Sequence, residues 1–234
     1  MGWFISPDGA STFAPELDRL YNIILVITAI AFVIVEFGLL YFSYKYRARP
    51  GHKAHYTHGN MTAEVIWTAI PAVTVVMIGV LSAPMWNKIK GRNSVPAGAL
   101  AYNVVAKQFE WNVGYPGADG QLNTGDDFKV RNQLHIPVNR DVVIEAQAED
   151  VIHSFFVPAF RVKQDVVPGM HMRIWFRATA PGQYELACAE LCGLGHYKMR
   201  AFVTVHTQAE YDQWLAERAA QAQSEAQPSA VASR

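Results

Sequence analysis

The segment Cys188-Ala-Glu-Leu-Cys192-Gly-Leu-Gly-His196-Tyr-Lys-Met199 decides how this chain folds and what it holds. It contains both cysteines of the chain, with a histidine, a methionine and the acid Glu190 beside them. Thiolate, imidazole and thioether groups form a soft ligand set, which suits copper better than magnesium, calcium or manganese. The segment therefore predicts a metal site built from sulfur and nitrogen.

The spacing within this segment leaves its local structure open between helix and loop. Positions four apart, such as the two cysteines and His196, lie on one face of a helix. Gly193 and Gly195 interrupt the segment, however, and favour a loop folded around a ligand. A disulfide between the cysteines is the main alternative, and it is plausible outside the cytoplasm. It would leave His196 and Met199 without a role.

The number of candidate ligands favours two metal ions over one. His153, in Val-Ile-His-Ser-Phe, is the candidate for a second imidazole. Zinc prefers four closed tetrahedral ligands and needs no methionine. A mononuclear blue-copper site uses one cysteine, two histidines and an axial methionine, so one cysteine would remain unused. Two copper ions bridged by both thiolates would use the whole set and share one unpaired electron, which suits rapid electron transfer.

Two long apolar segments, Leu20–Tyr44 and Ala63–Met85, occupy the first third of the chain. An α-helix rises 1.5 Å per residue, so about 20 apolar residues cross the ~30 Å of hydrocarbon in a bilayer. Both segments are long enough, and aromatic residues stand at their ends, as in an interfacial belt. Buried helices of a soluble protein are the alternative, which the absence of a polar face disfavours. We therefore predict a transmembrane helical hairpin.

The loop between these segments sets the expected orientation. The segment 45–53 is short and basic, whereas the charged residues before the first helix are mostly acidic. The positive-inside rule then places the loop in the cytoplasm, and the N-terminus and everything after Trp86 outside. The loop histidines are expected to be solvated, because no cysteine or acid joins them at ligand spacing (His52, His55, His58). Glu36 lies within the first apolar segment, where it either has a function or faces a partner subunit.

The remaining two thirds of the chain read as a β domain. Segments of alternating apolar and polar residues, separated by proline and glycine, predict a β-sandwich or barrel. They are residues 101–106, 141–147, 171–177, 182–187 and 200–206. The acidic stretch 116–127 lacks the spacing of a calcium loop and is predicted to be an exposed hairpin loop. Thr207-Gln-Ala-Glu210 is a capping box that predicts a helix to about Ala222.

The composition adds two exclusions to this organisation. The formal net charge is zero, which gives no indication of nucleic-acid binding, and there is no C-x-x-C-H haem attachment motif. In chain order, we predict an outer N-terminal segment (1–19), a transmembrane hairpin (20–86, helices about 20–46 and 63–86), a β domain with the metal site (87–206), and a capped helix with a disordered tail (207–234).

With these features together, the chain resembles subunit II of a haem–copper cytochrome c oxidase over nearly its full length. The resemblance implies a two-helix transmembrane hairpin, an all-β cupredoxin-like (Greek-key) domain and a short C-terminal helix. It also implies a binuclear copper site, the copper A site, whose ligands match at each position. They are His153, Cys188, Cys192, His196, Met199 and the backbone carbonyl of Glu190.

Other roles are also implied by the resemblance alone. The carboxylate of Glu190 would help to hold a magnesium or manganese ion shared with subunit I, and Glu64 would lie at the mouth of a proton-uptake channel. Glu149 and Asp150 would help to dock cytochrome c. These acids, with Asp119 in the 116–127 loop, could steer a basic donor by their charge.

Phe109 marks a departure from the family. Electrons would arrive through the aromatic pair Phe109 and Trp111, but relatives usually have tryptophan at both positions. The identity of the donor, or its docking pose, therefore stays open. Because no haem motif is present, the donor would be a separate cytochrome c or a cytochrome subunit of a larger respiratory complex.

The resemblance implies an electron-accepting subunit of an integral membrane oxidase. Electrons would pass from two copper ions to haem in subunit I, where oxygen is reduced to water and protons are pumped. Subunit I and further oxidase subunits would be partners, and the copper domain would face the periplasm of a bacterial plasma membrane. A membrane-tethered copper carrier and a disulfide-bonded receptor domain are the alternatives from other classes.

Overall fold

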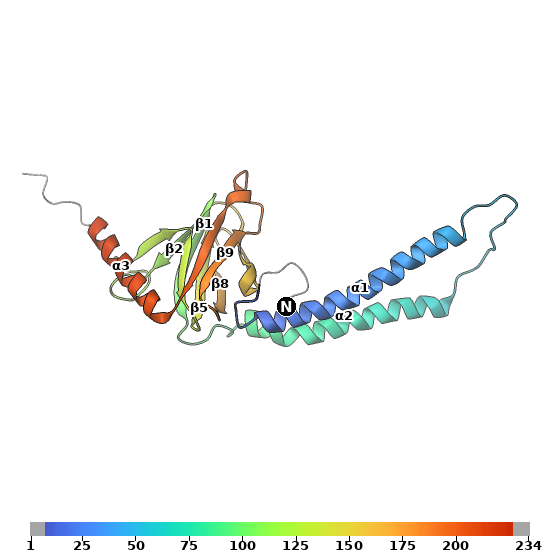
Figure 1. Cartoon of the computed structure of the whole chain (residues 1–234), viewed down its shortest axis with the longest axis horizontal. Coiled ribbons are helices and arrows are strands. Elements are labelled where there is room, and N and C mark those ends of the chain that lie inside the picture. The colour runs from blue at the N-terminus through green and yellow to red at the C-terminus, as the bar shows by residue number, and fades with distance from the viewer. Residues whose placement is uncertain (1–7, 227–234) are drawn as a thin grey trace, which may run out of the picture. The chain divides into compact units, whose positions relative to one another are not determined.

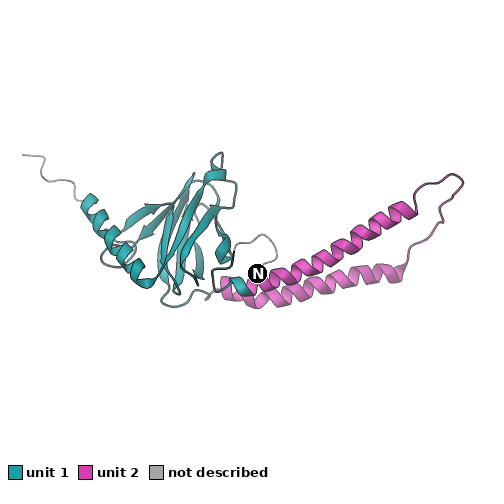
Figure 2. Cartoon of the chain, viewed as in Figure 1, with its two compact units in different colours: residues 1–15, 93–234 teal, residues 16–92 magenta. Residues whose placement is uncertain are grey.

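The computed structural model describes residues 8–226 of the chain (Figure 1). These residues form two compact units (Figure 2). One is helical and covers Glu16–Arg92, and the other, mainly β, combines residues 8–15 with residues 93–226.

The helical unit consists of α1 (Ala14–Lys45, whose first two residues belong to the other unit) and α2 (Met61–Lys90). Both helices extend beyond the predicted 20–46 and 63–86 at one or both ends, because the apolar run marks only the segment that a membrane would cover. The side chain of Asn60 caps α2 by accepting a hydrogen bond from the Ala63 N–H at 3.1 Å. Lysines in the last turn of α2 complement the helix dipole and let the helix continue to Lys90.

Both helices are long and apolar enough to cross a membrane, and none of the most apolar part of either is buried within the chain. Large apolar side chains such as Phe37 and Val75 are 69% and 68% exposed. Soluble proteins rarely leave an apolar surface of this size in water. The two helices therefore have the composition and exposure of membrane-spanning segments.

The β unit is a sandwich of two five-stranded sheets. The first has the order β3 (Phe128–Arg131), β2 (Glu110–Tyr115), β1 (Leu100–Lys107), β5 (Asp141–Ala148) and β8 (Met172–Arg177). The second has the order β4 (Gln133–Pro137), β10 (Arg200–His206), β9 (Gly182–Cys188), β6 (His153–Val157) and β7 (Val162–Val166). β1 pairs with β5 and β4 with β10 in parallel, and the other pairs are antiparallel.

The core lies between the two sheets, where alternate residues of the strands point inward. In β1, Tyr102, Val104 and Ala106 are buried while their neighbours are not. In the second sheet, Leu186 and Val203 likewise have no exposed surface. This arrangement confirms the predicted cupredoxin-like sandwich, because period-two alternation buries one face of each sheet.

The sequence predicted β1, β5, β8, β9 and β10 but not the other five strands. The missed strands are short, and two of them lack alternation. In β4, the residues from Leu134 to Pro137 are all buried, because α3 (Gln208–Ala226) covers the outer face with Trp214 stacked on His135. The sequence of β4 alternates polar and apolar residues, but the run is only five residues long and ends at a proline, so it is a weak strand signal.

The connections agree with the turn and capping signals. The stretch 116–127 joins the antiparallel neighbours β2 and β3, as a hairpin loop does. Thr207 and Glu210 form the reciprocal bonds of a capping box, with the Glu210 carboxylate 2.9 Å from the Thr207 N. α3 continues to Ala226, four residues beyond the predicted end. The predicted disordered tail began after about Ala222, so its first residues are helical, and the rest, from 227, lies outside the described residues.

Candidate metal centre

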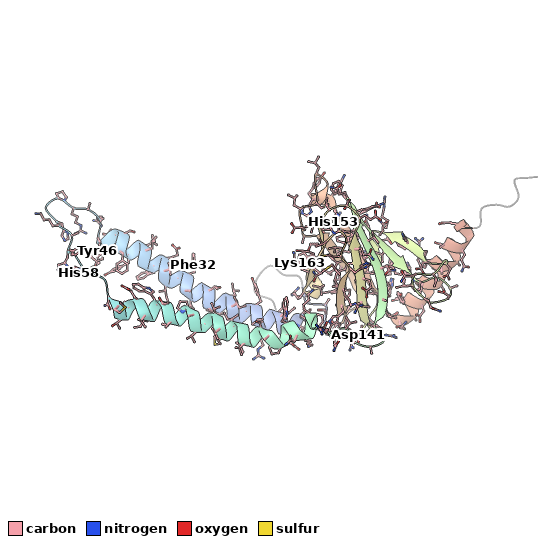
Figure 3. The ribbon with its side chains drawn as sticks, turned by 180° about the vertical axis from the view of Figure 1, so that it is seen from behind. Phe32, Tyr46, His58, Asp141, His153 and Lys163 are labelled. Atoms are coloured by element: carbon pink, nitrogen blue, oxygen red, sulfur yellow. The ribbon has the colours of Figure 1, made fainter. Side chains whose placement is uncertain are left out.

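Two strands of the second sheet, β6 and β9, and the loop that follows β9 carry the candidate ligands. His153 begins β6, Cys188 ends β9, and Phe155 lies opposite Cys188 in the antiparallel β6–β9 pair. The loop 189–199 then leads to β10 and includes a 3-10 turn at His196–Lys198. Figure 3 labels His153 within the β unit.

Backbone hydrogen bonds close this loop at its base. The Cys188 N–H donates to the Met199 carbonyl at 3.0 Å, and the Ala189 N–H donates to the Ser154 carbonyl at 3.1 Å. The loop therefore begins and ends at fixed points of the sheet, and its ligands converge although they are far from His153 in sequence. The glycines interrupt any helix, so the loop interpretation is confirmed.

The predicted ligands come together around the two sulfur atoms, which lie 3.8 Å apart. Cys188 Sγ is 3.9 Å from His153 Nδ1 and 3.3 Å from the Glu190 carbonyl oxygen. Cys192 Sγ is 3.6 Å from His196 Nδ1 and 3.7 Å from Met199 Sδ. Each sulfur thus has one imidazole nitrogen and one weaker donor beside it.

Most of these donors are shielded from water. His153 has no exposed surface, and Met199, Cys192 and Cys188 are 2%, 3% and 8% exposed. Burial, and then the neighbouring Cys188 thiol, raise the pKa of the Cys192 thiol above its usual value. Metal binding at such thiols must release protons, since the thiolate is the ligand form.

The sulfur separation argues against a disulfide, in which two sulfur atoms lie about 2.05 Å apart. Both cysteines are free in this structure. Separations of 3.6–3.9 Å between donors are those of ligand atoms placed about 2.0–2.3 Å from a shared metal. The donor set of thiolate, imidazole and thioether fits copper.

Asp150 fixes the orientation of His153. His153 Nε2 donates to Asp150 Oδ1 at 2.8 Å, which leaves Nδ1 facing Cys188. Although burial opposes the effect, hydrogen bonds from His153 and from the Gln108 and Val151 N–H groups lower the pKa of the Asp150 carboxyl. A carboxylate behind a ligand histidine sets its tautomer and raises its basicity. Sequence reasoning assigned Asp150 to docking alone, although its place three residues before a candidate ligand was a signal for this contact.

Phe109 packs on the ligand loop, whereas Trp111 lies inside the sandwich. A methyl group added at Gly195 would overlap the Phe109 ring, and one at Gly193 would lie 3.3 Å from it. Trp111 has no exposed surface, and its ring centroid is 6.2 Å from that of His153. Of the two predicted electron-transfer aromatics, only Phe109 can therefore contact another protein.

The remaining candidates are acids of the β unit and of the helical unit. Glu149 and Asp119 are exposed, and the Asp119 carboxylate accepts a hydrogen bond from the Gln121 N–H within its own loop. Glu64 occupies the first turn of α2, and Glu36 is exposed on α1, both in the helical unit.

Two family models match the chain. The transmembrane domain of cytochrome c oxidase subunit II matches residues 2–85, and the periplasmic domain of the same subunit matches residues 113–206. The first covers both apolar helices apart from the end of α2, and the second contains all six candidate ligands.

Individual relatives agree with the models. Cytochrome c oxidase subunit 2 of Thermostichus vulcanus is 32% identical over 89% of this chain and 76% of the relative. An alternative cytochrome c oxidase subunit 2 of Bradyrhizobium diazoefficiens is 32% identical over 85% of this chain and 79% of the relative. The crystal structure of the periplasmic domain of subunit II of cytochrome oxidase from Bradyrhizobium japonicum is 31% identical, with a TM-score of 0.48, over 54% of this chain and 97% of that one.

The cupredoxin-like domain carries a cluster of His153, Cys188 and Cys192 that fits copper, and both long helices are fit to span a membrane. The relatives are matched over most of their length. The chain therefore belongs to the cytochrome c oxidase subunit II family and is a membrane subunit of an oxidoreductase complex.

Proposed function

We propose that this chain accepts electrons from a cytochrome c at two copper ions and passes them to haem in subunit I. There, oxygen is reduced to water and proton pumping is driven. The observation that carries the proposal is the pair of sulfur atoms 3.8 Å apart, each with its own imidazole nitrogen and its own weaker donor. One metal ion would leave half of this set unused.

The bound copper would supply one-electron redox chemistry, and the protein holds its ligands in place. Cys188 lies at the base of a loop whose ends are hydrogen-bonded to each other, and Cys192 lies within this loop. His153 is fixed by Asp150 and shielded from water. Rigid, buried ligands change little in position when an electron arrives, and this keeps the reorganisation small.

An exposed apolar surface around the site supports docking to oxidase partners. Leu191, Leu194 and Tyr197 of the ligand loop are 78%, 97% and 85% exposed. Large exposed apolar side chains gathered on one loop are typical of an interaction surface. A donor or subunit I placed there would lie close to the copper ligands.

Glu190 would link the copper site to subunit I. Its carbonyl oxygen faces Cys188 Sγ at 3.3 Å, while the residue as a whole is exposed. The carboxylate is thus free to hold a magnesium or manganese ion with groups of subunit I. Glu64 would lie at the mouth of a proton-uptake channel. The N-terminus and the copper domain would lie on the periplasmic side of a bacterial plasma membrane.

Copper reconstitution of the purified full chain in detergent tests this proposal. We expect two copper ions per chain and a seven-line hyperfine pattern in the EPR spectrum, from one electron shared by two nuclei. A four-line spectrum from one copper, or a silent oxidised form, would contradict the binuclear site. Co-purification with a haem-bearing subunit is expected, whereas a copper carrier would be isolated alone.

A further inference from the structure

Gln108 is hydrogen-bonded to both halves of the metal centre. It lies in the turn between β1 and β2 of the first sheet. Its backbone N–H donates to Asp150 Oδ2 at 2.7 Å, and its side-chain Nε2 donates to the Cys192 carbonyl at 2.6 Å. A methyl group at Gly193 would lie 2.8 Å from this Nε2, so the glycine leaves room for the amide.

These bonds complete a continuous path between two ligands. His153 Nε2 donates to Asp150 at 2.8 Å, Asp150 accepts from Gln108, and Gln108 donates to the Cys192 carbonyl. His153 belongs to β6 and Cys192 to the loop after β9, so both ligands come from the second sheet. Gln108 comes from the first sheet, and it therefore ties the ligand loop across the end of the sandwich.

We propose that Gln108 is a positioning residue for the copper centre, an inference that rests on the proposed function above. Through Asp150 and the Cys192 carbonyl, it fixes the position of Cys192 relative to His153. Its amide also directs the positive end of a dipole towards Cys192. Hydrogen bonds near a cysteine ligand tune the potential of a copper site. Because the reduced centre carries more negative charge, this donor favours reduction and raises the reduction potential.

The substitution Gln108→Met tests the side-chain bond alone. Methionine has a similar length but no amide donor, and the backbone N–H to Asp150 is kept. We expect the reduction potential to fall and copper to pass to a chelator about 10–100-fold faster, the range for partners of metal ligands. Gln147→Met is the matched control, because Gln147 is exposed on β5 and takes no part in this path.

Two further variants separate positioning from a merely structural role. Gln108→Glu keeps the shape but places an acceptor against the Cys192 carbonyl, so the potential should fall further. Asp150→Asn turns an amide N–H towards the Gln108 N–H and breaks the path at its other link. The effects of Asp150→Asn and Gln108→Met on copper release should be less than additive, because both break one connected path.

The measurements use the copper-loaded full chain, with thermal unfolding of the copper-free chain alongside. An unchanged potential in Gln108→Met and Gln108→Glu overturns the proposal, whether or not unfolding shifts. Copper loss from Gln108→Met equal to that from Gln147→Met also overturns it. Failure of the wild-type chain to bind two copper ions would instead refute the proposed function. The wild-type sample alone tests this point.

Discussion

The Sγ atoms of Cys188 and Cys192 lie 3.8 Å apart, each with an imidazole nitrogen within 3.9 Å. This separation is too long for a disulfide and short enough for two thiolates to share metal ions. Each cysteine therefore has an imidazole beside its sulfur, although one cysteine ends a strand and the other lies in a loop.

Replacing one bridging thiol should abolish the shared-electron centre. In Cys192→Ser, the hydroxyl is a poor copper ligand, so one copper ion or none should remain. Metal analysis and EPR are the measurements, and a four-line spectrum or silence is expected. Ala216→Ser on the exposed side of α3 is the control and should keep the wild-type spectrum. Retention of two coppers and seven lines in Cys192→Ser would refute the bridging role.

Met199→Leu should keep two copper ions but raise their reduction potential. Leucine fills a similar volume, so unfolding should become easier by less than about 1.5 kcal/mol. The thioether, 3.7 Å from Cys192 Sγ and 2% exposed, is lost as a weak donor. A lost donor destabilises the oxidised ion more than the reduced one. Redox titration measures the shift, and an unchanged potential would show that Met199 is only a packing residue.

Gly195→Ala should displace Phe109 and slow electron transfer from cytochrome c. The new methyl group would overlap the Phe109 ring, and overpacking of this kind costs about 1–3 kcal/mol. Stopped-flow reduction of the copper-loaded chain measures the rate. Gly125→Ala is the matched control, because a methyl group there would meet no atom within 4 Å. Equal rates in both variants would argue against electron transfer through Phe109.

The stability of the β unit should fall as the pH falls from about 6.5 towards 4. His135 stacks on Trp214 at 4.0 Å, and burial, then His206 and Arg218, lower the His135 pKa to about 4. Between pH 6.5 and 4, His135 binds a proton in the unfolded chain but stays neutral in the folded chain. The free energy of unfolding therefore falls by up to about 3 kcal/mol.

Urea unfolding followed by tryptophan fluorescence at several pH values checks this dependence. His135→Phe keeps a ring against Trp214 but cannot titrate, so the loss of stability between pH 6.5 and 4 should be smaller. An identical pH profile in the two proteins would mean that other groups cause the loss.

Reduction by a basic cytochrome c should slow as ionic strength rises, because exposed charges are screened. Glu149→Gln should reduce both the rate at low salt and its salt dependence. Glu217→Gln, on α3, is the control for a change of one charge elsewhere. A rate that does not depend on salt would remove the acids from the docking surface.

The candidate site could be predicted in its ligands but not in its supporting contacts. Cys188, Cys192, His196 and Met199 fall within one short segment, and their chemistry identifies a soft metal site without any coordinates. Gln108 lies far from them in sequence, and although it stands next to Phe109, no pattern links its amide to the metal site. Only the sandwich brings its amide to the Cys192 carbonyl.

By itself, the sequence determined the two membrane helices, the alternating strands, the capping box and the kind of metal that fits. Each of these depends on the composition of a short window or on the chemistry of single side chains. The tertiary structure alone decided that Trp111 is buried, that His153 Nδ1 faces Cys188 Sγ, and that the Gln108 amide reaches the Cys192 carbonyl. These are contacts between residues of different strands, turns and loops, and their positions follow from how two sheets pack, which no local pattern records.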